Sequence, residues 1–228
     1  VKLEVSGKRS SLGQKNQKNK ERRVRQEDQY LKPYIPCMYT NADSLRNKIN
    51  ELKLMITNAE ELPMIIAVTE AKPKSFRFNL SDSELQLNNY EMFSLNLSER
   101  QGRGLIIYVH NSLKAVQVSV KSSFSEYILL EVNLVGDNSL LFGCVYRSPT
   151  SNVENNKLLL DLFKTIHNLP HSHKVLVGDF NYGSIQWKAG NIGLQPESDE
   201  DLFLSCTQDC FFFLSTCFYT HQSKSWTK

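Results

Sequence analysis

Acids and amides follow three apolar segments of this sequence, at the points where those segments end. Asn41 and Asp43 follow the first segment, Glu70 follows the second, and Asp179 and Asn181 follow the third. If the segments are strands, such groups gather at one edge of a sheet, where a cation can neutralise them. Mg²⁺ prefers hard oxygen ligands and takes one or two carboxylates, with water and substrate phosphate completing its shell. The pattern therefore predicts a site that binds Mg²⁺ and a phosphate ester.

Each of these residues also has an ordinary structural interpretation. Asp43 can cap a helix, Glu70 can lie in a loop, and Asn181 can form a turn. Taken singly, each residue fits that interpretation better than a functional one. The coincidence of polar groups at three strand ends favours a site.

The elements that would position these groups are predicted from apolar runs bounded by turn residues. The run at residues 64–68 is apolar on both faces and is expected to be a buried strand, and residues 174–177 are expected to form another buried strand. Asp43 or Ser44 is expected to cap the first helix, whose apolar face begins at Leu45. Strands are predicted at residues 35–40, 64–68, 90–95, 105–109, 127–134, 139–146, 174–177 and 211–219, and helices at 45–56, 152–169 and 197–209.

Many strands with few helices between them indicate an α+β sandwich rather than a doubly wound nucleotide-binding fold. No glycine-rich phosphate-binding motif opens a helix, so we expect no nucleotide cofactor. No run approaches the roughly 18 apolar residues that a membrane span needs. We therefore expect no membrane association.

Four motifs, in this order along the chain, resemble those of the endonuclease/exonuclease/phosphatase superfamily. Within it, they are most similar to the apurinic-endonuclease-like domain of non-LTR (LINE-type) retrotransposons, over roughly residues 35–220. The last motif, after an apolar strand, is the most specific. The motifs are Asn41-x-Asp43, Thr69-Glu70, Val145-Tyr146-Arg147-Ser148-Pro149 and Gly178-Asp179-Phe180-Asn181.

The resemblance implies a four-layered αββα sandwich of the deoxyribonuclease I type, with a DNA-nicking site at one edge. It implies that Glu70 binds Mg²⁺ or Mn²⁺ with help from Asp43 and Asn41. It also implies that Asp179 orients or activates the attacking water. The remaining implied roles are phosphate contacts by Asn181 and by Tyr146, and DNA phosphate contacts by the basic residues Lys72, Arg103 and Arg147.

The chain departs from the family near its end. Family members carry a late Ser-Asp-His on a closing strand, whereas here the late histidine is His221, with no adjacent Asp, and Lys228 is the last residue. We therefore expect that the last strands of the second sheet are missing and that activity is impaired. Residues 211–219 would then form an exposed apolar edge.

The first 34 residues carry ten Lys or Arg and four Asp or Glu, a net charge of +6 in a chain whose formal net charge is +3. Residues 1–33 are predicted to be a disordered basic tail, and residues 34–228 an incomplete endonuclease-like domain. The five cysteines show no paired spacing, and no secretion signal precedes them. Free thiols and a nuclear or cytoplasmic location are expected.

Three functions are consistent with these residues. The first is a Mg²⁺-dependent DNA endonuclease of a retroelement, acting as a monomer, whose family nicks target DNA to prime reverse transcription. The second is a phosphoinositide or nucleotide phosphodiesterase on the same fold. The third is a non-catalytic remnant that binds nucleic acid.

Overall fold

The computed structural model describes residues 34–73, 82–97, 102–134, 136–185 and 194–214. The chain divides into two units, residues 1–36 and 37–228. In the first unit only residues 34–36 are described, so the predicted basic tail lies outside the described residues.

The first sheet has four strands in the spatial order β1 (Cys37–Asn41), β2 (Ile65–Thr69), β4 (Leu105–His110) and β3 (Tyr90–Leu95). β1 and β2 are parallel and are joined by helix α2 (Leu45–Asn58), whereas the other neighbours are antiparallel. A short 3-10 helix, η1 (Asp82–Leu85), precedes β3.

The second sheet also has four strands, in the order β5 (Ala115–Gln117), β6 (Tyr127–Asn133), β7 (Ser139–Tyr146) and β8 (His173–Asp179). β7 and β8 are parallel and are joined by helix α3 (Val153–His167), so this sheet repeats the arrangement of the first. Helix α4 (Asp199–Asp209) follows β8 in sequence.

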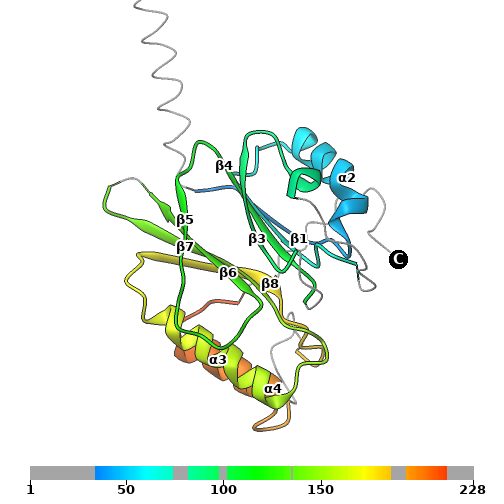
Figure 1. Cartoon of the computed structure of the whole chain (residues 1–228). Coiled ribbons are helices and arrows are strands. Elements are labelled where there is room, and N and C mark those ends of the chain that lie inside the picture. Colours follow the sequence, from blue (N-terminus) through cyan, green and yellow to red (C-terminus); the bar gives the residue numbers. More distant parts are fainter. Residues whose placement is uncertain (1–33, 74–81, 98–101, 135, 186–193, 215–228) are drawn as a thin grey trace, which may run out of the picture. The chain divides into compact units, whose positions relative to one another are not determined.

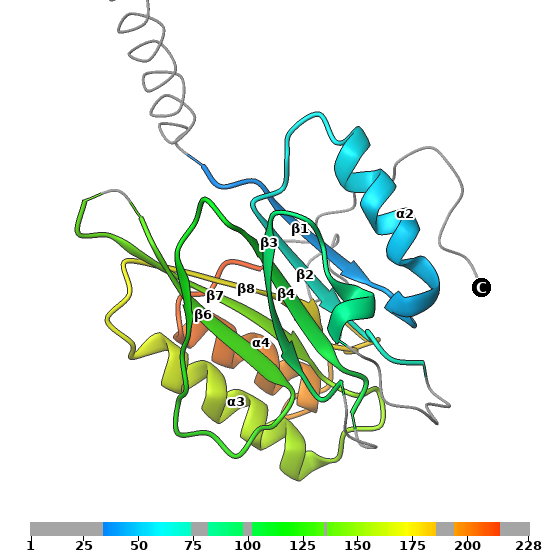
Figure 2. The same cartoon turned by 45° about the horizontal axis from the view of Figure 1, so that its top comes forward.

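The elements form four layers. α2 lies on the outer side of the first sheet, and α3 and α4 lie on the outer side of the second (Figures 1 and 2). The predicted αββα sandwich is therefore confirmed. In the described part of the chain, no helix is long and apolar enough to cross a membrane.

Strand alternation explains how one sequence fills these layers. Ile66 and Val68 of β2 pack in the cluster that contains Leu45 and Leu52 of α2. Their neighbour Ala67 points to the opposite face of the sheet and is fully buried there. On the second sheet, the outward-facing side chains pack against both helices, and this cluster includes Leu129, Leu141, Val145, Leu159, Phe163 and Phe203.

The prediction that Asp43 or Ser44 caps α2 is wrong. Ser44 occupies the N-cap position, but no side chain hydrogen-bonds to the open N–H groups of the helix. Asp43 and Ser44 have φ values of 41° and 90°, a left-handed backbone in which the side chain does not reach back over the first turn. In contrast, Asn152 does cap α3 by accepting a hydrogen bond from the N–H of Asn155 at 2.9 Å.

Two strand predictions are also wrong. β8 is half-buried or exposed rather than buried, because among the described residues it pairs with β7 alone. Phe211–Leu214 form no strand, because α4 ends there in a Schellman motif. In this motif Phe211 has φ 56° and the N–H of Phe212 donates to the carbonyl of Thr207 at 2.8 Å. The rest of the predicted strand, residues 215–219, lies outside the described residues.

Two short elements, η1 and β5, were not predicted, since each spans four residues or fewer. The cysteines behave as expected, because all four that the structure describes are free thiols.

Candidate active site

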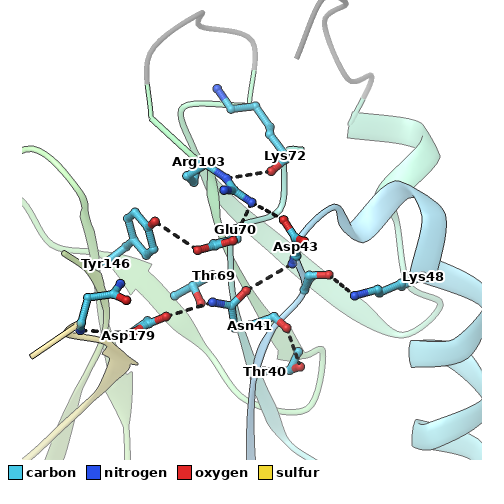
Figure 3. A network of polar contacts seen from close by, with 12 residues as sticks. Thr40, Asn41, Asp43, Lys48, Thr69, Glu70, Lys72, Arg103, Tyr146 and Asp179 are labelled. Carbon is cyan, nitrogen blue, oxygen red and sulfur yellow. Dashed lines mark hydrogen bonds and ion pairs between the residues drawn. The ribbon is translucent and has the colours of Figure 1, made fainter. Parts of the chain in front are cut away.

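Four of the predicted site residues lie at the ends of four strands. Asn41 and Asp179 are the last residues of β1 and β8, Tyr146 is the last residue of β7, and Glu70 directly follows β2. Figure 3 shows Tyr146 and Asp179, which come from the second sheet, turned toward Glu70 and Asn41 of the first. The strand-end pattern in the sequence therefore corresponds to one cluster in space.

Two hydrogen bonds join the sheets at this cluster. The side-chain N–H of Asn41 donates to Oδ2 of Asp179 at 2.9 Å. The hydroxyl of Tyr146 donates to Oε1 of Glu70 at 3.1 Å. Both bonds connect residues far apart in the sequence, so the cluster forms only when the two sheets pack together.

The loops that carry the acids are held by a backbone hydrogen bond that continues the pairing of β1 with β2, and by a bond from the backbone to the side chain of Asn41. The N–H of Ser44 donates to the carbonyl of Glu70 at 2.9 Å, and the N–H of Asp43 donates to Oδ1 of Asn41 at 3.2 Å. Asp43, Ser44 and Glu70 all have positive φ, and Glu70 has φ 53°. Such conformations cost on the order of 1–3 kcal/mol each and concentrate at functional sites.

Arg103 lies between the two carboxylates of the first sheet (Figure 3). Its Nη2 lies 2.5 Å from Oε2 of Glu70 and 2.6 Å from Oδ1 of Asp43. The side chains of Arg103 and Glu70 are 14% and 13% exposed, whereas that of Asp43 is 66% exposed. Glu70 and Asp43 therefore converge on one positive charge at the edge of the sandwich.

The same two carboxylates fit a divalent metal ion. They supply hard oxygens that already meet at one cationic group, and Mg²⁺ needs only one or two carboxylates from the protein. No cluster of three or more His, Cys, Asp or Glu side chains exists among the described residues, so a zinc-type site has no support there. Asn41, the third predicted ligand, lies beside them and hydrogen-bonds to Asp43 and Asp179.

Asp179 is fixed on both of its oxygens. Oδ2 accepts from Asn41, and Oδ1 accepts from the backbone N–H of Asn181 at 3.2 Å. Asn181 has φ 50°, and its side-chain N–H donates to the carbonyl of Arg147 at 2.7 Å. The turn after β8 thus holds a carboxylate in a set orientation at the edge of the sandwich.

Gly178 makes this turn possible. Its φ is 157°, and a Cβ atom built on it would lie 1.8 Å from the carbonyl oxygen of Val145 on β7. No residue with a side chain fits so close to the neighbouring backbone. The glycine before Asp179 is therefore required by the packing of β8 against β7.

Comparison with solved structures finds this arrangement of layers in known proteins. One is the endonuclease domain of TRAS1, a telomere-specific non-LTR retrotransposon, with a TM-score of 0.52 at 14% identity, over 78% of this chain and 71% of that one. Another is the AP endonuclease LMAP from Leishmania major, with a TM-score of 0.56 at 15% identity, over 77% of this chain and 66% of that one. The chain has the fold of the endonuclease/exonuclease/phosphatase superfamily.

At these identities the likeness shows the fold. No protein-family model matches the sequence, and no curated protein matches it significantly. The chain also spans slightly less than two thirds of the length of the Leishmania protein.

Two of the basic residues that were predicted to contact DNA are buried in this fold. Lys72 is 1% exposed and Arg147 is 6% exposed. Nε of Arg147 donates to Oδ1 of Asn156 at 2.7 Å, and its Nη1 donates to the carbonyl of Asn181 at 2.9 Å. The guanidinium also lies 4.0 Å from the ring centroid of Tyr182. Arg147 therefore braces the turn that carries Asp179, rather than presenting its charge to solvent.

Burial sets the protonation of the phenol at the site. Burial first, and then the negative charge of Glu70, raise the pKa of Tyr146 well above the ordinary value of 10.0. Tyr146 is therefore neutral across the physiological range and can donate a hydrogen bond. Burial also raises the pKa of the Glu126 carboxyl, although the backbone N–H of Arg103 and the charges of Lys72 and Arg103 oppose that shift.

Two residues near the cluster, Tyr39 and Glu126, were not identified from the sequence. The hydroxyl groups of Tyr39 and Thr69 are hydrogen-bonded, with 3.0 Å between their oxygens, and Thr69 directly precedes Glu70. Glu126 contributes its backbone carbonyl to the N–H of Tyr146 at 3.0 Å. Tyr39 had a usable signal, because it precedes Asn41 by two residues and so shares its strand face. Glu126 lies before β6 and had none.

Proposed function

We propose that the chain is a Mg²⁺-dependent phosphodiesterase that nicks DNA, in the manner of a retrotransposon endonuclease domain. The observation that carries this proposal is the convergence of Glu70, Asp43, Asp179 and Tyr146 at one edge of the sandwich, with Asn41 hydrogen-bonded between Asp43 and Asp179. A phosphodiester is negatively charged and repels a nucleophile. Its hydrolysis therefore needs a cation, a placed carboxylate and hydrogen-bond donors, and this cluster supplies residues for all three tasks.

Each residue has a task that follows from its chemistry. Glu70 and Asp43 hold Mg²⁺ or Mn²⁺ through carboxylate oxygens, with Asn41 beside them. When bound, the cation polarises a phosphoryl oxygen and stabilises the oxyanion of the leaving group. Asp179, held on both oxygens, orients the attacking water and accepts its proton.

Two donors would bind the phosphate. Tyr146 keeps its proton and donates to a phosphate oxygen or to the leaving group. An amide nitrogen carries two N–H donors, so Asn181 can bind the phosphate with one while the other holds the carbonyl of Arg147. Such donors stabilise charge that grows in the transition state.

DNA is the proposed substrate because two independent lines point the same way. The motifs around Asp43, Tyr146 and Asp179 resemble those of retrotransposon endonucleases. The fold is similar to that of a retrotransposon endonuclease domain and of an AP endonuclease. We propose that the protein acts as a monomer and without a nucleotide cofactor.

Nicking of supercoiled plasmid tests this proposal. Because impaired activity is expected, enzyme is used in excess over plasmid, so that slow nicking is detected. Wild-type protein should then convert supercoiled to nicked circles when Mg²⁺ or Mn²⁺ is present, and not when EDTA replaces them. Glu70→Gln removes a metal-binding charge and should slow nicking about a hundredfold or more. Glu51→Gln is the matched control, because Glu51 is an exposed residue of α2.

The same assay separates the substrate classes. A soluble aryl phosphodiester and a phosphoinositide are offered beside plasmid under identical conditions. Preference for plasmid supports the proposed function, whereas preference for either small diester would reassign the substrate. Plasmid binding without any metal-dependent cleavage would contradict the proposed enzymatic activity and favour a nucleic-acid-binding role.

A further inference from the structure

The cation between Glu70 and Asp43 in this structure is a side chain of the protein itself. Nη2 of Arg103 contacts Oε2 of Glu70 and Oδ1 of Asp43 at 2.5 and 2.6 Å (Figure 3). These are charge-assisted hydrogen bonds to both carboxylates that are proposed to hold the metal ion.

The position of Arg103 is fixed by its backbone. The carbonyl of Arg103 accepts from the N–H of Lys72 at 2.8 Å, and the carbonyl of Gly104 accepts from the N–H of Ala71 at 3.1 Å. Nε of Arg103 donates to the carbonyl of Lys72 at 3.1 Å. These bonds tie the Arg103 turn to the segment that follows Glu70, so the guanidinium is aimed at the carboxylates by the fold rather than by chance contact.

A guanidinium and a divalent ion cannot share this position. Mg²⁺ binds carboxylate oxygens at about 2.0–2.1 Å and carries two positive charges. Nη2 already occupies the space between the same two oxygens, and its charge repels a second cation at that range. The side chain of Asp43 is 66% exposed, so the two carboxylates are open to solvent on the Asp43 side. Arg103 and a metal ion can exchange from that side.

We propose that Arg103 is a built-in competitor of the divalent ion, an inference that rests on the proposed function. Without metal, the guanidinium neutralises Glu70 and Asp43 and holds both carboxylates together at the site. Metal binding requires Arg103 to leave them. Only molecules in which Arg103 has left the two carboxylates can bind the metal ion. The apparent metal affinity is therefore the intrinsic affinity multiplied by the fraction of such molecules.

Calorimetric titration of the full chain with Mn²⁺ and with Mg²⁺ tests this inference without measuring activity. Arg103→Gln removes the competing charge and should bind Mn²⁺ about tenfold more tightly than wild type. Arg46→Gln is the matched control, because Arg46 forms an exposed ion pair with Glu84 at 3.1 Å. Its metal affinity should equal that of wild type. Glu70→Gln should abolish the tight binding in both backgrounds.

The outcomes separate the two proposals. If Glu70-dependent binding occurs but Arg103→Gln binds no more tightly than wild type, the competition is refuted and the proposed function stands. If neither wild type nor Arg103→Gln shows Glu70-dependent binding, both proposals fail. Should Arg103→Gln not fold by near-ultraviolet circular dichroism, Arg103→Met decides. Methionine is a long side chain without charge, so tighter binding than wild type supports competition and equal or weaker binding overturns it.

Discussion

The side-chain N–H of Asn41 donates to Oδ2 of Asp179 at 2.9 Å, although the two residues lie 138 positions apart. Asn41 ends β1 in the first sheet, and Asp179 ends β8 in the second. The other end of the same amide accepts from the N–H of Asp43 at 3.2 Å. One short side chain therefore links the loop that carries Asp43 to the carboxylate on the opposite sheet.

Replacement of Asn41 should uncouple the two sheets at this edge. Asn41→Ala leaves Asp179 Oδ2 and the Asp43 N–H without these partners, which should cost about 1–3 kcal/mol of unfolding free energy. Urea denaturation measures this loss. Asn50→Ala, at an exposed position of α2, should change stability by less than about 0.5 kcal/mol. Equal stability of the two variants would show that the Asn41–Asp179 bond contributes nothing.

Gly178 should not tolerate a methyl group. Gly178→Ala forces a Cβ into the carbonyl of Val145, so β8 must shift from β7, at a cost of about 3 kcal/mol or more. Gly183→Ala is the control, because a Cβ there meets no atom within 4 Å. Guanidinium unfolding of both variants checks the prediction. A stable Gly178→Ala would mean that the two strands separate at this point more easily than their packing suggests.

Loss of Arg147 should act on stability rather than on DNA affinity. Arg147→Met leaves Oδ1 of Asn156 and the carbonyl of Asn181 without their donor, which should cost about 2–4 kcal/mol. Thermal unfolding measures the cost, with the exposed Arg46→Met as control. The alternative, that Arg147 contacts a DNA phosphate, is tested by measuring plasmid binding over a salt series. A salt slope reduced by about 1 with unchanged stability would show that Arg147 contacts a phosphate instead.

The strand ends could be predicted because their signals are local. Continuous apolar runs bounded by polar residues mark where β2 and β7 stop, and so locate Glu70 and Tyr146 from the sequence alone. The same signals locate Asp179 after an apolar run. No local signal indicates that β1 lies near β8. That these strand ends meet could be predicted from the sequence through the family resemblance.

The partners of the charged residues could not be predicted, because they depend on packing between distant segments. Arg103 follows Glu70 by 33 positions, and no spacing rule links it to Glu70 and Asp43. Arg147 looks like a surface charge beside Tyr146 until the turn at Asn181 closes over it. The backbone conformation of Ser44 likewise depends on a distant segment, because its N–H donates to the carbonyl of Glu70. In this conformation no side chain caps α2.

The protonation of Tyr146 predicts a specific loss of stability in alkali. Its pKa is raised in the folded protein, chiefly by burial, so the unfolded chain ionises this phenol first. Stability should therefore be unaffected by this group below about pH 10 and should fall as pH rises toward the folded pKa. Unfolding free energies of wild type and Tyr146→Phe at about pH 9 and about pH 11 measure the effect. The variant should lose less stability over this interval, and an equal loss would contradict a buried, neutral phenol.

The most direct test of the account is the rate of Mg²⁺-dependent plasmid nicking by Asp179→Asn. The substitution keeps the size of the side chain and removes the carboxylate that is proposed to activate water. With enzyme in excess, we expect a rate about a hundredfold or more below wild type. Asp137→Asn, at an exposed turn between β6 and β7, should nick at the wild-type rate. If Asp179→Asn, folded like wild type, nicks as fast as Asp137→Asn, the edge of the sandwich at β8 is not the active site.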